Sequence, residues 1–130
     1  MKLIKTHRDL EVYKQSFDLA MQIFQSSKAF PKEERYSLTD QVRRSSRSIC
    51  DNLAEAWRKR RYEASFISKL SDAEAEAAET QVWIEFAVEC EYLEPEIGKN
   101  LLSFYEKILG ELVSMINNVK PWLLPGAKIR

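Results

Sequence analysis

The residue types that most often perform chemistry are scarce in this chain. Its 130 residues include one histidine, His7, and two cysteines, Cys50 and Cys90. A di-iron centre in a helical bundle needs two Glu-x-x-His motifs, and a hydrolytic triad needs a histidine that the fold brings to a serine. The cysteines lack CxxC spacing, so they indicate neither a zinc site nor a redox motif. We expect partly buried, reduced thiols, and no catalytic residue, metal, cofactor or small-molecule substrate.

Charge is unevenly distributed along the chain. Residues 43–69 contain eight basic and three acidic residues, whereas residues 72–96 contain nine acidic residues and no basic one. Twenty basic and twenty acidic residues cancel overall, so no net field draws the whole molecule to nucleic acid or to a membrane. Oppositely charged faces suit self-association or a partner of one sign.

The densest basic run lies between two aromatic residues, Trp57 and Tyr62. Basic groups attract phosphates, and exposed aromatic rings stack on unpaired bases, although we expect Trp57 in the core. Four charges at a turn also need no ligand, so a solvated turn is the alternative interpretation. With two further arginines as helpers, the candidate nucleic-acid-binding residues are Arg43, Arg47, Arg58, Lys59, Arg60 and Arg61.

A second polar pattern occupies the same segment as Arg43 and Arg47. Arg44, Ser48, Asn52 and Glu55 follow one another at steps of four, four and three. Such groups beside a bundle core specify register and partner, or they form an ordinary boundary between core and solvent. A turn near residue 60 brings Glu79 within reach of Arg44, so we expect these two residues to pair. The candidate structural polar stripe is therefore Arg44, Ser48, Asn52, Glu55 and Glu79.

Four helical segments must position these residues. Three glycines and four prolines, among abundant Ala, Leu, Glu, Lys and Arg, favour long helices and an all-α fold. Asp9 is a plausible N-cap, and Pro31 and Pro95 suit first helical turns. The predicted helices span residues 9–28, 31–58, 62–91 and 95–119 of a single domain, residues 1–130, with a tail that frays at its end. Short connections between four amphipathic helices predict an up-down-up-down antiparallel four-helix bundle.

Apolar residues at helical spacing predict which faces are buried. The two central helices each show one line, namely Leu38, Val42, Ser45, Ile49, Leu53 and Ala56, and Phe66, Leu70, Ala73, Ala77, Thr80, Ile84 and Ala87. The first helix has a predicted core line of Leu10, Tyr13, Phe17, Met21 and Phe24 beside a second line of Val12, Leu19 and Ile23. The last has a main line of Ile97, Leu101, Phe104, Ile108, Leu112, Met115 and Val119 beside Leu102, Tyr105, Leu109, Val113 and Ile116. One bundle does not need two apolar lines on a helix, so we expect a homo-oligomer.

The chain contains no uncharged run of 18 residues and no signal-peptide pattern at its beginning. We therefore expect a cytoplasmic protein without a membrane partner.

Several motifs, in order and at the right separations, resemble one bacterial family. They are His7-Arg8-Asp9-Leu10, Phe30-Pro31-x-x-Glu34, Gln41-x-x-Arg44-x-x-x-Ser48-Ile49-x-x-Asn52-x-Ala54-Glu55, Phe66-x-x-x-Leu70 and Glu79-Thr80-Gln81. The family is the four-helix-bundle family encoded by intervening sequences in 23S rRNA genes, which is S23 ribosomal-protein-like. It is similar in fold to the accessory protein of diversity-generating retroelements. Ala56 and Arg58 depart from its pattern, where members often have glycine, so we expect a longer second helix and a more rigid turn.

The resemblance, which covers about residues 7 to 95, implies a homopentamer closed into a ring and a nucleic-acid contact. It points to an accessory RNA-binding protein. The alternative is a homo-oligomeric scaffolding or protein-interaction module with no nucleic-acid ligand.

Overall fold

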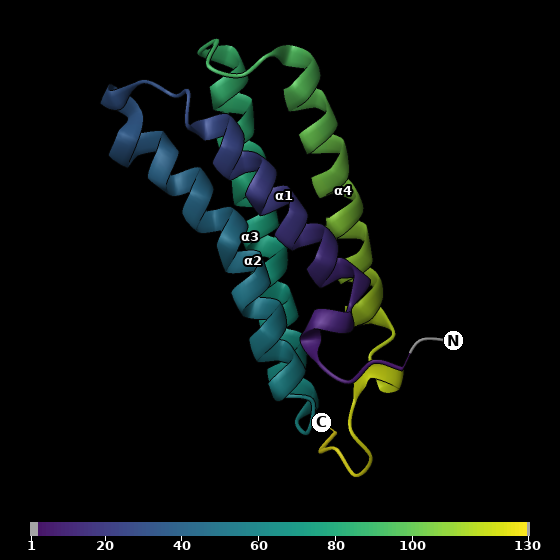
Figure 1. Ribbon diagram of the computed structural model, residues 1–130. Helices are drawn as coiled ribbons and strands as arrows, with labels where there is room; N and C mark the ends of the chain where they lie inside the picture. The colour runs from purple at the N-terminus through teal and green to yellow at the C-terminus, as the bar shows by residue number, and fades with distance from the viewer. Residues whose placement is uncertain (1–2, 130) are drawn as a thin grey trace.

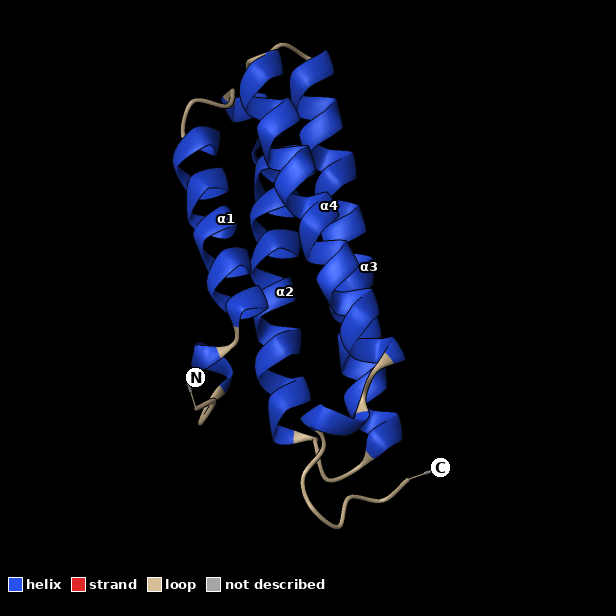
Figure 2. Ribbon diagram, turned by 90° about the vertical axis from the view of Figure 1, so that its right-hand side faces the viewer, coloured by secondary structure: helices blue, strands red, loops and turns tan. Residues whose placement is uncertain are grey.

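Four helices run alternately up and down to form an antiparallel bundle (Figure 1; Figure 2). The computed structural model describes residues 3–129. The helices are α1 (Glu11–Ser27), α2 (Asp40–Arg58), α3 (Glu63–Glu89) and α4 (Pro95–Asn117). Within the described chain there is no β-strand, and none of its helices is long and apolar enough to cross a membrane. The predicted all-α four-helix bundle is confirmed.

The predicted helix ends need two corrections. Asp9 does not cap α1, because its carboxylate accepts hydrogen bonds from the backbone N–H groups of Lys5 and Thr6, at 2.9 and 3.1 Å. These bonds close a short 3-10 helix, His7–Asp9, and α1 begins two residues later. Contrary to the prediction, the second helix does not begin as an α-helix at Pro31.

A 3-10 turn, Lys32–Glu34, and a π-helix, Arg35–Thr39, lead into α2 instead. Tyr92, in the connection between α3 and α4, donates a hydrogen bond from its hydroxyl to the Glu34 carboxylate at 2.9 Å. Leu38, one turn later, is buried in the core. The π-helix thus begins next to a residue bound to the α3–α4 connection and carries Leu38 into the core.

The core is built from the predicted lines of α2 and α3, every member of which is buried. Trp57 is also buried, at 5% exposure, as expected. In the first helix, Phe17 and Met21 are 49% and 45% exposed, so their assignment to the core is wrong, whereas Leu10 of the same line is buried. The second predicted line, Val12, Leu19 and Ile23, is buried as well. The face that packs inward carries smaller residues, which let α1 approach its neighbours closely. These buried residues are Val12, Ser16, Leu19, Ala20, Ile23 and Ser27.

The side of α4 that faces the core lies between its two predicted apolar lines. Tyr105, from the second line, is completely buried, together with Ile108 and Leu112 from the main line. Ile97 and Phe104, also from the main line, are 44% and 51% exposed, so their assignment to the core is wrong.

The two cysteines differ in their surroundings. Burial, with a smaller effect of the Asp51 carboxylate, raises the pKa of the half-buried Cys50 thiol to about 12. Cys90 caps the C-terminal end of α3 and is exposed, contrary to the expectation that both would be partly buried. Neither forms a disulfide.

Helices α3 and α4 approach closely where Gly98 lies in the first turn of α4. Gly98 is buried, and a Cβ atom built on it would overlap Cγ2 of Val88 and lie 3.8 Å from Cδ2 of Leu93. Gly110, further along the same helix, has open space at the same position.

We predict opposite effects when these two glycines are replaced by alanine. Gly98→Ala overpacks the contact with Val88 and should lower the free energy of unfolding by about 1–3 kcal/mol. Gly110→Ala only removes the flexibility of glycine in an exposed helix and should raise it by about 0.5–1 kcal/mol. Urea denaturation followed by circular dichroism measures both. Equal stability of the two variants would contradict the close approach.

Candidate nucleic-acid interface

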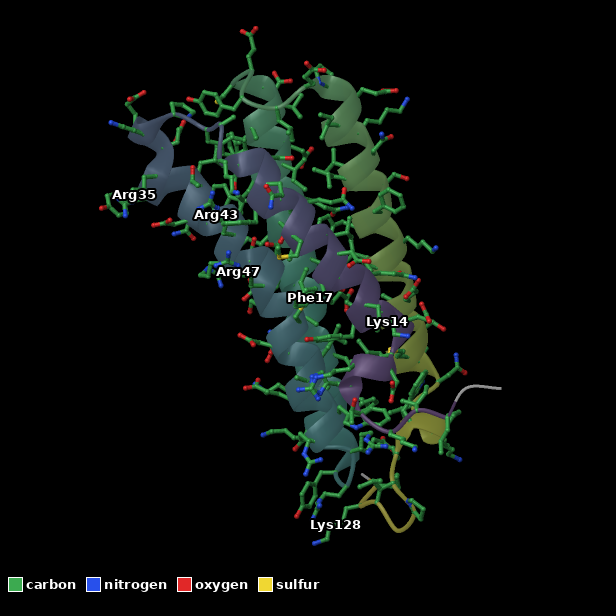
Figure 3. The ribbon with its side chains drawn as sticks, viewed as in Figure 1. Lys14, Phe17, Arg35, Arg43, Arg47 and Lys128 are labelled. Atoms are coloured by element: carbon green, nitrogen blue, oxygen red, sulfur yellow. The ribbon has the colours of Figure 1, made fainter. Side chains whose placement is uncertain are left out.

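Helix α2 presents its basic residues on a face that points away from α3. Arg43, Arg47 and Arg58 follow steps of four and eleven residues, close to one and three helical turns, so they share one side of the helix. Arg44 lies on the neighbouring side and reaches α3. Figure 3 shows Arg43 and Arg47 projecting from the outer edge of α2, with Arg35 of the π-helix nearby.

Three cations surround the ring of Phe24 on α1. The Lys28 Nζ and the Arg43 Cζ each lie 4.9 Å from the ring centroid, and the Arg47 Cζ lies 5.7 Å from it. Cation–π contacts of this kind contribute about 0.5–1 kcal/mol each at exposed sites. We call Phe24, Lys28, Arg43 and Arg47 the Phe24 cluster.

Arg43 is held in place by the end of α1. Its Nε donates a hydrogen bond to Ser27 Oγ at 2.7 Å, and the Ser27 hydroxyl donates to the Phe24 carbonyl at 3.1 Å. Ser27 is buried, at 2% exposure, so this anchor is fixed. The carbonyl groups at the C-terminal end of α1 also favour positive charge beside them.

The positive charge of the Phe24 cluster is not neutralised by an ion pair. Within residues 3–129, no carboxylate lies within 4.0 Å of the charged groups of Lys28, Arg43 or Arg47. Asp40 and Asp51 line a shallow depression with the two arginines without pairing with them. The cluster therefore offers three cations to an anionic partner.

The turn between α2 and α3 holds the second basic group. Lys59 and Arg61 are exposed there, as is Arg58, the last residue of α2. Arg60 instead stacks on Trp57, with its Cζ 3.4 Å from the ring centroid, and its Nε donates to the Trp57 carbonyl at 2.7 Å. Burial, and to a lesser degree the charge of Arg58, lowers the pKa of the Arg60 guanidinium.

The predicted basic residues thus form two groups, one in the Phe24 cluster and one at the C-terminal end of α2 and the turn that follows it. Eleven residues separate Arg47 from Arg58, which corresponds to about 16 Å along the helix axis. Sequence reasoning missed Phe24, which it placed in the core, and Lys28. The signal that was available is the spacing of four residues from Phe24 to Lys28, which places a cation over an aromatic ring on one helix face.

The polar stripe joins α2 to α3. Arg44 pairs with Glu79, as predicted, at 2.5 Å, and also makes two contacts of 3.2 Å with Glu76, which was not predicted. Ser48 donates to Glu76 at 3.0 Å, and the Asn52 amide donates to the Ser48 carbonyl at 3.0 Å. The remaining stripe residue, Glu55, pairs with Lys69 instead, at 3.0 Å.

The surroundings of the Glu79 carboxylate in this network shift its pKa. Burial opposes its ionisation, but hydrogen bonds donated by Trp83 Nε1, at 3.0 Å, and by Arg44 outweigh burial and lower the pKa of Glu79 below 4.5. Hydrogen bonds to Glu76 and Glu79 raise the pKa of Arg44. The side chains of Arg44 and Glu79 are 49% and 36% exposed, so the pair lies at the rim of the bundle.

We predict a measurable but modest coupling between Arg44 and Glu79. For such partly exposed charges, a double-mutant cycle of Arg44→Ala and Glu79→Ala should give about 0.5–1 kcal/mol. Because the pKa of Glu79 is lowered in the folded state, its contribution is present above pH 4.5 and lost as the pH falls through the folded pKa. Thermal melts measured between neutral and acidic pH test both effects.

The long, exposed Lys14–Glu11 pair, at 3.7 Å, is the matched control and should show no coupling. Additive effects of the Arg44 and Glu79 substitutions would show that the pair does not contribute.

Comparisons of the sequence and of the structure with known proteins both point to one family. The family model described as 23S rRNA-intervening sequence protein matches residues 8–116. A solved structure from Bacteroides thetaiotaomicron, described as a protein of unknown function from the S23 ribosomal protein family, is 31% identical with a TM-score of 0.74. The match covers 82% of this chain and 95% of that one. No curated protein matches this chain. The chain belongs to the 23S rRNA-intervening sequence protein family.

Proposed function

We propose that this protein is a cytoplasmic accessory protein that binds RNA through the phosphate groups of the RNA backbone. The observation that supports the proposal best is the Phe24 cluster, where three cations meet without an acidic partner in the described chain. Arg58, on the same side of α2, and the exposed Lys59 and Arg61 of the following turn add further cations. The family description, which refers to 23S rRNA, agrees with this choice of nucleic acid.

The geometry favours phosphates over bases as the groups recognised. Guanidinium groups bind phosphate oxygens through two parallel hydrogen bonds, and Arg43 and Arg47 stand one helical turn apart. The ring of Phe24 is already in contact with cations, so it supports them rather than stacking on a base. Tyr62, 46% exposed at the turn, is the aromatic residue better placed to stack. Contacts of this kind give little sequence preference.

Local charge, rather than the charge of the whole protein, must attract the RNA. The net charge is zero, and residues 72–96 contain nine acidic residues and no basic one. Repulsion from these acidic residues, which belong to α3, the connection after it and the start of α4, orients an approaching strand towards α2. Screening by salt should therefore weaken binding steeply.

We predict that Arg43→Glu combined with Arg47→Glu lowers the affinity for single-stranded poly(U) by about tenfold or more at low salt. The loss of two phosphate contacts should also reduce the slope of log affinity against log salt by about 1.4. Filter binding across a salt series measures both quantities. Sedimentation and a thermal melt establish that the variant keeps its fold and assembly state.

Lys99→Glu combined with Lys107→Glu is the matched control, because it makes the same change of net charge on exposed residues of α4. Equal losses in the two double variants would mean that net charge alone governs binding. Absence of binding by the wild type at low salt would contradict the proposal.

A specific observation favours self-assembly as a second function. The exposed apolar side chains lie mainly on three helices: Phe17 and Met21 on α1, Val82 and Phe86 on α3, and Ile97, Phe104 and Val113 on α4. Exposed apolar residues on several faces of a small domain suit contacts between copies. We propose that the protein is a homo-oligomer, for which a closed ring of five copies is the arrangement implied by the family. Such a ring joins different faces of neighbouring copies, as basic α2 and acidic α3 allow.

We predict that the wild type sediments as an oligomer at micromolar concentration and that Phe17→Ser with Met21→Ser shifts it towards monomer. The two side chains are the exposed apolar pair of α1, so their loss removes contact area without opening the core. Tyr36→Ser, which removes an aromatic residue that is 73% exposed on the π-helix, is the control and should leave the assembly intact. A monomeric wild type would contradict the proposal.

A further inference from the structure

The chain beyond the family match has a defined structure of its own. The match ends at residue 116, and α4 ends at Asn117. After a 3-10 turn, Lys120–Trp122, the chain passes beneath the bundle and returns to the connection between α2 and α3 (Figure 1; Figure 2). Trp122 and Leu123 at the start of this segment pack against the core, and the fraying expected at the end of the tail stays a prediction.

Three backbone hydrogen bonds fasten the tail to the basic turn. The N–H groups of Leu124 and Lys128 donate to the carbonyls of Arg60 and Arg61, at 3.2 and 2.8 Å. The Glu63 N–H donates to the Lys128 carbonyl at 2.9 Å, and Tyr62 and Lys128 form an isolated parallel bridge. Glu63 is the first residue of α3, where N–H groups have no partner within the helix. The tail thus satisfies backbone groups that the turn cannot pair for itself.

A tight turn gives the tail the shape that these bonds need. The Ala127 N–H donates to the Leu124 carbonyl at 3.0 Å, and Pro125 and Gly126 occupy the two central positions. Gly126 has a φ of 77°, in the left-handed region that glycine and asparagine tolerate and proline cannot adopt. This turn directs the following residues back to Arg61.

From these contacts we infer that residues 120–129 are a clamp that completes the RNA-binding surface at the α2–α3 turn. The clamp holds the backbone of Arg60 and Arg61 in one conformation and adds Lys128 to the exposed cations Arg58, Lys59 and Arg61. The side chain of Lys128 extends from the same end of the molecule (Figure 3). This inference rests on the proposed RNA binding, but the clamp itself is testable without RNA.

Three single substitutions in the full chain separate the clamp from the charge. Gly126→Pro keeps every charge but excludes the backbone conformation of the turn. Gly126→Asn also keeps every charge and tolerates that conformation, so it is the matched control. Lys128→Gln removes one cation and keeps the backbone hydrogen bonds.

Hydrogen exchange of the Glu63 amide, measured by nuclear magnetic resonance, reports on the clamp in the absence of RNA. We expect about tenfold faster exchange in Gly126→Pro, because the bond to the Lys128 carbonyl is lost, and wild-type exchange in the other two variants. Exchange at the wild-type rate in Gly126→Pro would overturn the clamp, whatever the outcome with RNA.

Binding of poly(U) reports on the function of the clamp. We expect the affinity to fall about two- to fivefold in Gly126→Pro and in Lys128→Gln, with the salt slope reduced by about 0.7 in the latter. Gly126→Asn should bind as the wild type does. Faster exchange without weaker binding in Gly126→Pro would overturn the role in RNA binding and leave the clamp purely structural. Failure of the wild type itself to bind poly(U) would reject the proposed function, and the exchange result would still decide whether the clamp exists.

Discussion

Close packing of α2 against α3 is the constraint on which the rest of the structure depends. Ser45, Ala73, Ala77 and Thr80 are completely buried where the helices face each other. Their small side chains allow the helices to approach closely, and the oxygens of Thr80 and Ser45 lie 2.8 Å apart, within hydrogen-bonding distance. Because Ser45 faces α3, Arg43, two residues earlier on the helix, lies on the side of α2 that points away from α3. The basic face is therefore a geometric consequence of how the core of the bundle is built.

Much of this arrangement is predictable from the sequence, and the exceptions have physical causes. The lines of α2 and α3 are unambiguous because each helix has one apolar face, and the contact of Arg44 with Glu79 follows from antiparallel geometry. In α1, two apolar lines compete, and periodicity alone does not choose between them. The structure buries the line that includes Ser16 and Ala20, because small residues allow closer packing, and it leaves the larger Phe17 outside.

In the candidate interface, too, features set by local sequence spacing are predictable, whereas contacts between distant parts of the chain are not. Arg43 and Arg47 are predictable from their spacing on one helix. The withdrawal of Arg60 onto Trp57 depends on side-chain packing at the turn, which charge pattern does not reveal. The approach of Lys128 joins residues more than sixty positions apart in the chain through backbone hydrogen bonds, and these leave no pattern in side-chain type.

The two proposed functions meet on α1. Phe17, Met21, Phe24 and Lys28 follow one another at steps of four, three and four, so the exposed apolar residues and the Phe24 cluster share one side of the helix. If a neighbouring copy covers Phe17 and Met21, the cluster lies at the rim of that contact rather than beneath it. Each added copy then contributes another set of cations along the assembly. Several weak phosphate contacts on one strand would combine into a much stronger one, and the proposed RNA binding would then need no net charge on the single chain.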